Sequence, residues 1–284
     1  LESCRALADE GLRLTILPVD RDGLIDPEKL QDAIEDTTVL VSVMAVNNEI
    51  GVVQPLAEIG ALCRSRGVLL HTDAAQAAGK IALDINTMNI DLLSISGHKL
   101  YAPKGIGALY VRRRPRARLN AEMSGGGQER GLRSGTLAPA LIVAFGLACE
   151  ISGAEMASEG ARLAALRQRL LDALTASVPN AFVNGAMEPR VPGNLNVGFP
   201  GVDAEALMAA LDDVAISTGS ACTSASVEPS YVLQALGLGD EAARASVRIG
   251  LGRFTTDAEI DHAASRIVET VHELRGTRAS AAAE

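Results

Sequence analysis

The chain of 284 residues has no tryptophan and only 2% aromatic residues, so its core must be built from Ala, Leu, Val and Ile. It has no excess of basic residues either: 26 Lys and Arg stand against 35 Asp and Glu, a formal net charge of −9. Surfaces for nucleic acid or anionic membranes need clustered cations. The one basic run, at 111–119, is short, and we interpret it as a solvated loop. We therefore expect neither nucleic-acid nor membrane binding.

Cysteine is also scarce. The thiols Cys4, Cys63, Cys149 and Cys222 have neither CxxC spacing nor the density of a disulfide framework. This favours a reducing, cytoplasmic setting and does not favour a metal cluster built from this chain alone. We expect no apolar run long enough to span a bilayer and no signal peptide. Because the chain begins directly in a helix-like pattern, we expect the N-terminal part of a larger protein to be missing.

Apolar segments alternate with amphipathic segments through the first part of the chain. Strands are expected at 12–19, 38–46, 68–72, 92–96 and 106–113. Helices are expected at 26–36, 55–67, 138–152 and 155–178. Near-continuous apolar strands separated by amphipathic helices predict an α/β fold, with a mainly parallel sheet and helices on both faces.

The C-terminal part predicts a smaller α+β unit. Its expected strands lie at 194–199, 214–218 and 246–251, and its expected helices at 203–211 and 256–275. We therefore predict a large domain at 1–154 and a small domain at 155–284. In such α/β proteins, ligands bind at the carboxyl ends of strands and between domains.

Polar side chains collect where two of the expected strands end. Asp73 and Gln76 follow the strand at 68–72, and His98 and Lys99 follow the strand at 92–96. A carboxylate beside a lysine suits a pyridoxal phosphate site. The lysine forms a Schiff base, and the carboxylate keeps the pyridine nitrogen protonated so that the ring can accept electrons. A salt-bridged lysine at a strand end is the structural alternative.

The four lysines of the chain differ in their surroundings. Lys29 lies in an expected surface helix, Lys80 follows a turn, and Lys104 lies in a PKG turn. Lys99 alone closes an apolar strand, which favours it as the cofactor lysine.

One cysteine lies in an unusual setting. Cys222 occurs in STGSACTSASVEPSYVL (217–233), where no bulky apolar neighbour could bury it. A structural cysteine behaves as a small hydrophobe in a core, whereas a reactive one needs exposure and access. We interpret Cys222 as reactive and Cys4, Cys63 and Cys149, which lie in helix patterns, as packing residues.

These segments together resemble a cysteine desulfurase of the class-V group of fold-type I pyridoxal phosphate enzymes, of the iron–sulfur assembly type, housekeeping or nitrogen-fixation subgroup. The resemblance covers nearly the whole chain in order. It is carried by VNNEIGVVQP (46–55), HTDAAQAAGK (71–80), SISGHKLYAPKGIGALYVR (94–112), GGGQERGLRSGT (125–136), the segment 217–233 and VRIGLGRFTT (247–256).

The resemblance implies a role for each polar residue at the strand ends. Lys99 would form the Schiff base, Asp73 would pair with the pyridine nitrogen, and Gln76 would donate to the phenolic oxygen of the cofactor. Ser96 and His98 would bind the phosphate. His98 also stands beside Lys99 and Cys222 among the implied catalytic residues.

The resemblance extends to the substrate and to partners. Asn48 and Arg248 match the pair that holds the substrate carboxylate, and Asn48 is also counted among the cofactor residues. A turn-stabilising amide and a domain-interface ion pair are the structural alternatives for these two. Thr136 matches a residue that reaches the phosphate of the neighbouring subunit, which implies a homodimer. Cys222 would take sulfur from L-cysteine as a persulfide, leave L-alanine, and pass the sulfur to an iron–sulfur scaffold protein. It could there ligate a shared [2Fe–2S] cluster.

Two departures from the family pattern bear on function. The family's N-terminal third, which carries a Gly-rich phosphate loop and a His that stacks on the cofactor ring, is absent from this sequence. The longer tail that docks the scaffold in some members is absent too. Two alternatives therefore stay open: another class-V aminotransferase or lyase, and an inactive fragment that serves only as a dimerisation or scaffold-binding module.

Overall fold

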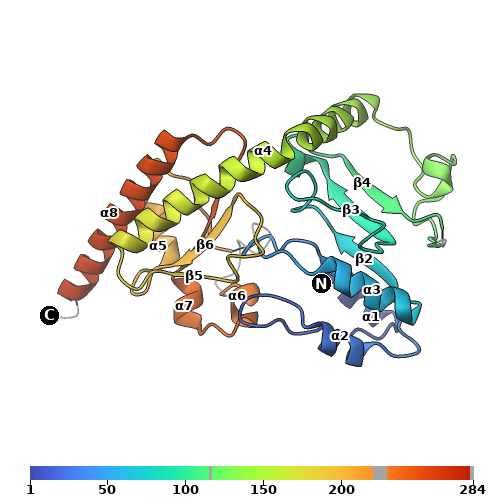
Figure 1. The fold of residues 1–284 in the computed structure, drawn as a ribbon, viewed down its shortest axis with the longest axis horizontal. Coiled ribbons are helices and arrows are strands. Elements are labelled where there is room, and N and C mark those ends of the chain that lie inside the picture. Colours follow the sequence, from blue (N-terminus) through green and yellow to red (C-terminus); the bar gives the residue numbers. More distant parts are fainter. Residues whose placement is uncertain (115–116, 220–228, 282–284) are drawn as a thin grey trace.

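The computed structural model describes residues 1–114, 117–219 and 229–281, the last four by their backbone alone (Figure 1). Cys222 lies outside these ranges. The described residues form two units, each built around its own sheet, and a long helix runs along both.

The first unit contains a four-stranded sheet in the order β1-β2-β3-β4. Its strands are β1 (Leu40–Met44), β2 (Leu69–Asp73), β3 (Leu92–Ser96) and β4 (Gly107–Val111). β1, β2 and β3 are parallel, and β4 is antiparallel to β3. The prediction of a mainly parallel sheet is confirmed.

Three helices precede or connect these strands: α1 (Glu2–Asp9), α2 (Pro27–Ala33) and α3 (Leu56–Arg66). α2 begins where the Asp26 carboxylate accepts a hydrogen bond from the Glu28 backbone N–H, and proline occupies its first turn. α3 ends at Gly67, whose φ of 70° is left-handed. Ile59 and Cys63 are the buried anchors of α3 in the first core.

The expected strand at 12–19 is wrong. Within it only Val19 makes a β-bridge, to Ile25 a few residues later, while Leu12 and Ile16 are more than half exposed. A strand is stabilised by its neighbours, and apolar character alone did not supply one here.

The second unit pairs helices with a three-stranded antiparallel sheet in the order β5-β6-β7. Its elements are α4 (Pro139–Ser177), β5 (Phe182–Val183), β6 (Asn194–Gly198), α5 (Ala204–Ala210), α6 (Tyr231–Ala235), α7 (Asp240–Arg244), β7 (Ser246–Gly250) and α8 (Asp257–Ala281). Its core joins apolar residues of α4, β6, β7 and α8, among them Leu170, Leu195, Val247 and Ile267, all fully buried.

Two expectations for this region need correction. The two helices predicted at 138–152 and 155–178 are one helix, α4, because Gly153 lowers helix propensity by about 1 kcal/mol without blocking any hydrogen bond, as proline would. The strand expected at 214–218 is reduced to a bridge between Ser217 and Arg248.

The expectation that no apolar run could span a bilayer is also wrong by length and composition, because α4 passes both criteria. Several apolar residues in its first half, including Ile142, Val143 and Leu147, are exposed. The second half of the same helix is packed in the core through Leu166, Leu170 and other residues. We therefore do not interpret α4 as a membrane span.

Close packing of α3 yields a prediction. A Cβ added at Gly60 would lie 1.8 Å from the Met88 carbonyl oxygen, a backbone atom that cannot rotate away. We expect Gly60→Ala to destabilise the protein by about 1–3 kcal/mol. Gly146→Ala in α4, where nothing lies within 4 Å, should stabilise it by about 0.5–1 kcal/mol. Denaturant unfolding of both variants measures this, and equal effects would contradict the packing described for Gly60.

Candidate active site

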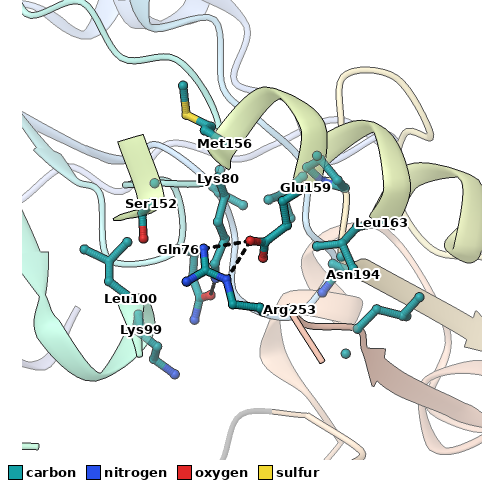
Figure 2. A pocket seen from close by; sticks show the side chains of 18 of the residues that line it. Gln76, Lys80, Lys99, Leu100, Ser152, Met156, Glu159, Leu163, Asn194 and Arg253 are labelled. Atoms are coloured by element: carbon teal, nitrogen blue, oxygen red, sulfur yellow. Dashed lines mark hydrogen bonds and ion pairs between the residues drawn. The ribbon is translucent and has the colours of Figure 1, made fainter. Parts of the chain in front are cut away.

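A cavity of about 250 Å³ lies between the two units (Figure 2). Four of the residues singled out in the sequence line it, and they come from four separate segments: Asn48, Gln76, Lys99 and Arg248. Residues of α4 and of the loop after β7 complete the wall. The structure thus brings substrate-binding and cofactor-binding candidates to one cavity.

Strand register explains why the carboxylate and the lysine come from the same edge of the sheet. β2 and β3 are parallel, and Asp73 lies opposite Ser94. Lys99 follows in a short 3-10 helix, η1 (Gly97–Leu100), and its side chain is exposed. Gly97 is required there because a Cβ would lie 2.8 and 2.9 Å from two atoms of Ile106. The Asp73 carboxylate is half-buried and accepts a hydrogen bond of 2.9 Å from the Ala75 backbone N–H.

The two predicted phosphate residues contact each other. The Ser96 hydroxyl lies 2.9 Å from Nδ1 of His98, and the His98 side chain is exposed. Ser96 is the last residue of β3, and His98 follows in η1 on the same segment as Lys99.

The two predicted substrate residues are joined across the units. Nη1 of Arg248, on β7, donates to the Asn48 carbonyl oxygen at 3.1 Å. The backbone of Arg248 is fixed by its bridge to Ser217, with an N to O distance of 2.6 Å. Arg248 therefore enters the cavity from a rigid backbone.

Of the predicted site residues within the described ranges, Asp73, Ser96, His98 and Thr136 do not line this cavity. Thr136 is exposed at the end of the Gly-rich segment 123–136 and does not line it. Cys222 belongs to the segment that lies outside the described residues.

Sequence reasoning missed a functional candidate, Lys80. Its side chain lines the cavity, and its Nζ donates to Oε1 of Gln76 at 3.2 Å (Figure 2). Burial, and to a lesser extent the nearby Lys99, lower the pKa of Lys80 to about 8, with Glu159 partly opposing both. The signal was present, because Lys80 follows Gln76 by four residues, the spacing at which side chains meet on a helical turn.

A second group missed in the sequence joins the small unit to the large one. The Arg253 Nε donates to Oε2 of Glu159 at 2.9 Å, and the same guanidinium pairs with Glu155 at 3.1 Å. Its charged carbon lies 5.2 Å from the centroid of the Tyr101 ring, and its backbone N–H donates to the Tyr101 hydroxyl at 2.8 Å. Tyr101, Glu159 and Arg253 all line the cavity.

The groups around this cavity fit pyridoxal phosphate. The cofactor needs an amine for its aldehyde, an acid for its ring nitrogen and a donor for its phenolic oxygen. Lys99 and Gln76 line one cavity, and Asp73 ends the strand beside β3. Ser96 and His98 are the polar residues available at this edge for a phosphate.

Comparison with known proteins agrees with this chemistry. The aminotransferase class-V family matches residues 1–262. The chain is 58% identical to the mitochondrial cysteine desulfurase of Arthroderma benhamiae, over 97% of this chain and 54% of that protein. It is 54% identical to the cysteine desulfurase IscS of Rickettsia akari, over 97% of this chain and 67% of that protein. A solved structure titled NifS-like protein superposes with a TM-score of 0.87 at 31% identity, covering 95% of this chain and 71% of that one.

The chain therefore belongs to the class-V aminotransferases, a family of pyridoxal phosphate enzymes. Within that family it falls among the cysteine desulfurases, which match it along nearly its whole length. The resemblance described from the sequence is confirmed. The chain spans between about half and two thirds of the length of these relatives.

The lowered pKa of Lys80 predicts a pH-dependent stability. The group titrates near pH 8 when folded, against an ordinary value of 10.5. Between these values the unfolded chain binds more protons at this site, so the stability that the lysine costs falls as the pH rises. Relative to Lys80→Met, the free energy of unfolding of the wild type should rise by up to about 1.4 kcal/mol per pH unit in this window. Denaturant unfolding of both proteins at about pH 7, 8.5 and 10 measures this, and a constant difference would contradict it.

Proposed function

We propose that this protein is a cysteine desulfurase that converts L-cysteine to L-alanine and carries the sulfur away as a persulfide on Cys222. The observation that carries the proposal is the single cavity lined by Lys99, Gln76, Asn48 and Arg248. Sequence identity to cysteine desulfurases along 97% of the chain supports it.

The proposed cofactor is pyridoxal 5′-phosphate, which when bound supplies an electron sink for breaking bonds next to the substrate nitrogen. Lys99 would hold its aldehyde carbon through the side-chain amine. Asp73 would keep a proton on the ring nitrogen, and Gln76 would donate to the phenolic oxygen. Ser96 and His98 would hold the phosphate.

Arg248 and Asn48 would orient the substrate. A guanidinium presents five N–H donors in a plane and can grip a carboxylate through two parallel hydrogen bonds. One nitrogen of Arg248 is engaged by the Asn48 carbonyl at 3.1 Å, which fixes the direction of the group. The remaining donors can hold the carboxylate of cysteine, and Asn48 can add its amide.

Sulfur transfer balances without an external oxidant. The Cys222 thiolate forms a bond to the substrate sulfur as the carbon–sulfur bond breaks. The electron pair of the broken bond goes to Cβ, which takes a proton and becomes the methyl group of alanine. Free thiols have a pKa near 8.5, so a minority is thiolate at neutral pH unless the site lowers it.

The proposed acceptor of the persulfide is an iron–sulfur scaffold protein, where Cys222 could also ligate a shared [2Fe–2S] cluster. A homodimer is proposed from Thr136, whose exposed position leaves it accessible to a second subunit. The cytoplasm remains our prediction for the location, although the Arthroderma relative is described as mitochondrial. Housekeeping and nitrogen-fixation roles both remain compatible with the proposal.

The activity is tested with L-cysteine and a reductant. The full-length wild type should be yellow with cofactor and should release sulfide and alanine. Cys222→Ala should stay yellow but lose sulfide release by at least about a hundredfold, because the thiolate that accepts sulfur is missing. Cys149→Ala, which removes an exposed thiol elsewhere, should retain wild-type activity.

The outcomes separate the alternatives. Full sulfide release by Cys222→Ala would assign sulfur transfer to another cysteine. A colourless wild type that releases no sulfide would leave an inactive interaction module. A yellow wild type that transfers amino groups without releasing sulfide would indicate another class-V reaction.

The cofactor lysine can be identified directly. Borohydride reduction of the holoprotein followed by peptide mapping should find the cofactor on Lys99, the lysine of η1 at the cavity. Lys104 provides an internal comparison, because it follows the same strand but does not line the cavity. A label on Lys80 or Lys104 would overturn the assignment.

A further inference from the structure

We propose that Lys80 is a positioning residue that fixes the carboxamide of Gln76, so that its NH₂ group faces the cofactor oxygen in the cavity. The inference deepens the proposed function and rests on it. It concerns how the donor to the cofactor is oriented, which the geometry of Lys80 and Gln76 addresses directly.

The contact between the two side chains determines the orientation of the amide. Lys80 Nζ lies 3.2 Å from Oε1 of Gln76. An ammonium group has only donors, so the atom it contacts must be the carbonyl oxygen and cannot be the amide nitrogen. The two ends of a carboxamide point in different directions. With its oxygen held by Lys80, Gln76 is left with its NH₂ group as the donor on the other side.

The backbone that carries both residues cannot easily move. Helical turns fix it, with hydrogen bonds from Ala78 to Ala74 and from Ile81 to Ala77. Gly79 lies between the two residues at a φ of 68° and is packed on both sides. A Cβ there would lie 2.4 Å from Leu100 and 2.8 Å from Ser152. The turn is therefore held between η1 and α4.

The charges around Lys80 show that no ion pair accounts for the position of its ammonium group in the cavity. Lys99 on η1 repels it, and Glu159 on α4 attracts it. However, Glu159 is already paired with Arg253 from the small unit, at 2.8 Å. Among the described residues, Lys80 has no ion pair, and its side chain donates a hydrogen bond to Gln76 alone. A half-buried cation without an ion pair costs stability, and the hydrogen bond to Gln76 is the interaction that gives its ammonium group a role in the cavity.

The same contact would strengthen the donor. A cation at the carbonyl end of an amide polarises it and makes its N–H groups better donors. An anionic oxygen of the cofactor facing Gln76 would then be stabilised in two ways: by an oriented hydrogen bond and by a nearby positive charge. Both effects lower the pKa of the protonated form of that chromophore.

The test measures cofactor affinity and absorbance in addition to turnover. The full-length protein is stripped of cofactor and titrated with pyridoxal phosphate, as the wild type, Lys80→Met, Gln76→Ala and the double variant. Each single variant should bind about tenfold more weakly, the loss expected for a charge-assisted hydrogen bond. The double variant should have the same affinity for pyridoxal phosphate as the single variant that binds it less tightly, because Lys80 acts through Gln76.

The pH titration of the visible band gives a second readout. Lys80→Met should move the midpoint upward, because a positive charge near the cofactor has been removed. Lys80→Arg, which keeps a cationic donor, should recover most of the affinity and of the midpoint. Lys29→Met removes an exposed lysine on α2 and is the matched control, with both quantities unchanged.

Several results would overturn the inference. Losses that add in the double variant would mean that Lys80 acts independently of Gln76, through Lys99 or through folding. Unchanged affinity and midpoint in Lys80→Met would mean that it does not position the amide. If Lys80→Met is unchanged in both quantities while the wild type releases sulfide, the proposed function stands and this inference alone fails.

Discussion

The cavity depends on the hydrogen bonds that one buried carbonyl accepts across the two units. The backbone carbonyl oxygen of Glu49 accepts hydrogen bonds from the side-chain amides of Asn194 and Asn196 on β6, at 3.1 and 3.2 Å. Asn196 lies opposite Arg248 in the register of β6 and β7. Fixing β6 to the turn that contains Glu49 therefore brings Arg248 to Asn48. Buried polar groups left unpaired cost about 1–3 kcal/mol each, so this contact holds the units in one arrangement.

The sequence predicted the strands of the first sheet because each lies in an apolar run, although β1 and β2 bury only alternate residues and β4 is largely exposed. The segment at 92–96 matches β3 residue for residue, and Lys99 was found because parallel strands end at one edge of a sheet. Residues 12–19 have the same apolar character and form no strand, since pairing depends on distant parts of the chain. Local pattern was sufficient only where the partner strand was predictable too.

The residues of the site at the strand ends of the first sheet were predictable from the sequence, and those contributed by α4 and the loop after β7 were not. Residues at strand ends, such as Asp73 and Gln76, carry a local signal. Glu159 and Arg253 are 94 positions apart and meet only because the small unit folds back on α4. Lys80 was judged by its turn alone. The role proposed for Lys80 depends on its contact with Gln76, four residues earlier, and on its having no ion pair among the described residues. No sequence pattern shows the second of these.

The continuity of α4 changes how the two units should be regarded. With 39 residues and a rise of 1.5 Å each, the helix is about 58 Å long and extends along both units. Its first half lies against η1 and its second half is a core element of the small unit. The boundary predicted at residues 154 and 155 falls inside this helix, which contacts elements of both units. Bending α4 would move Glu159 relative to Lys80, and Arg253 would move with Glu159 because the two are paired. The stiffness of this one helix therefore sets the distances between the charged groups of the cavity.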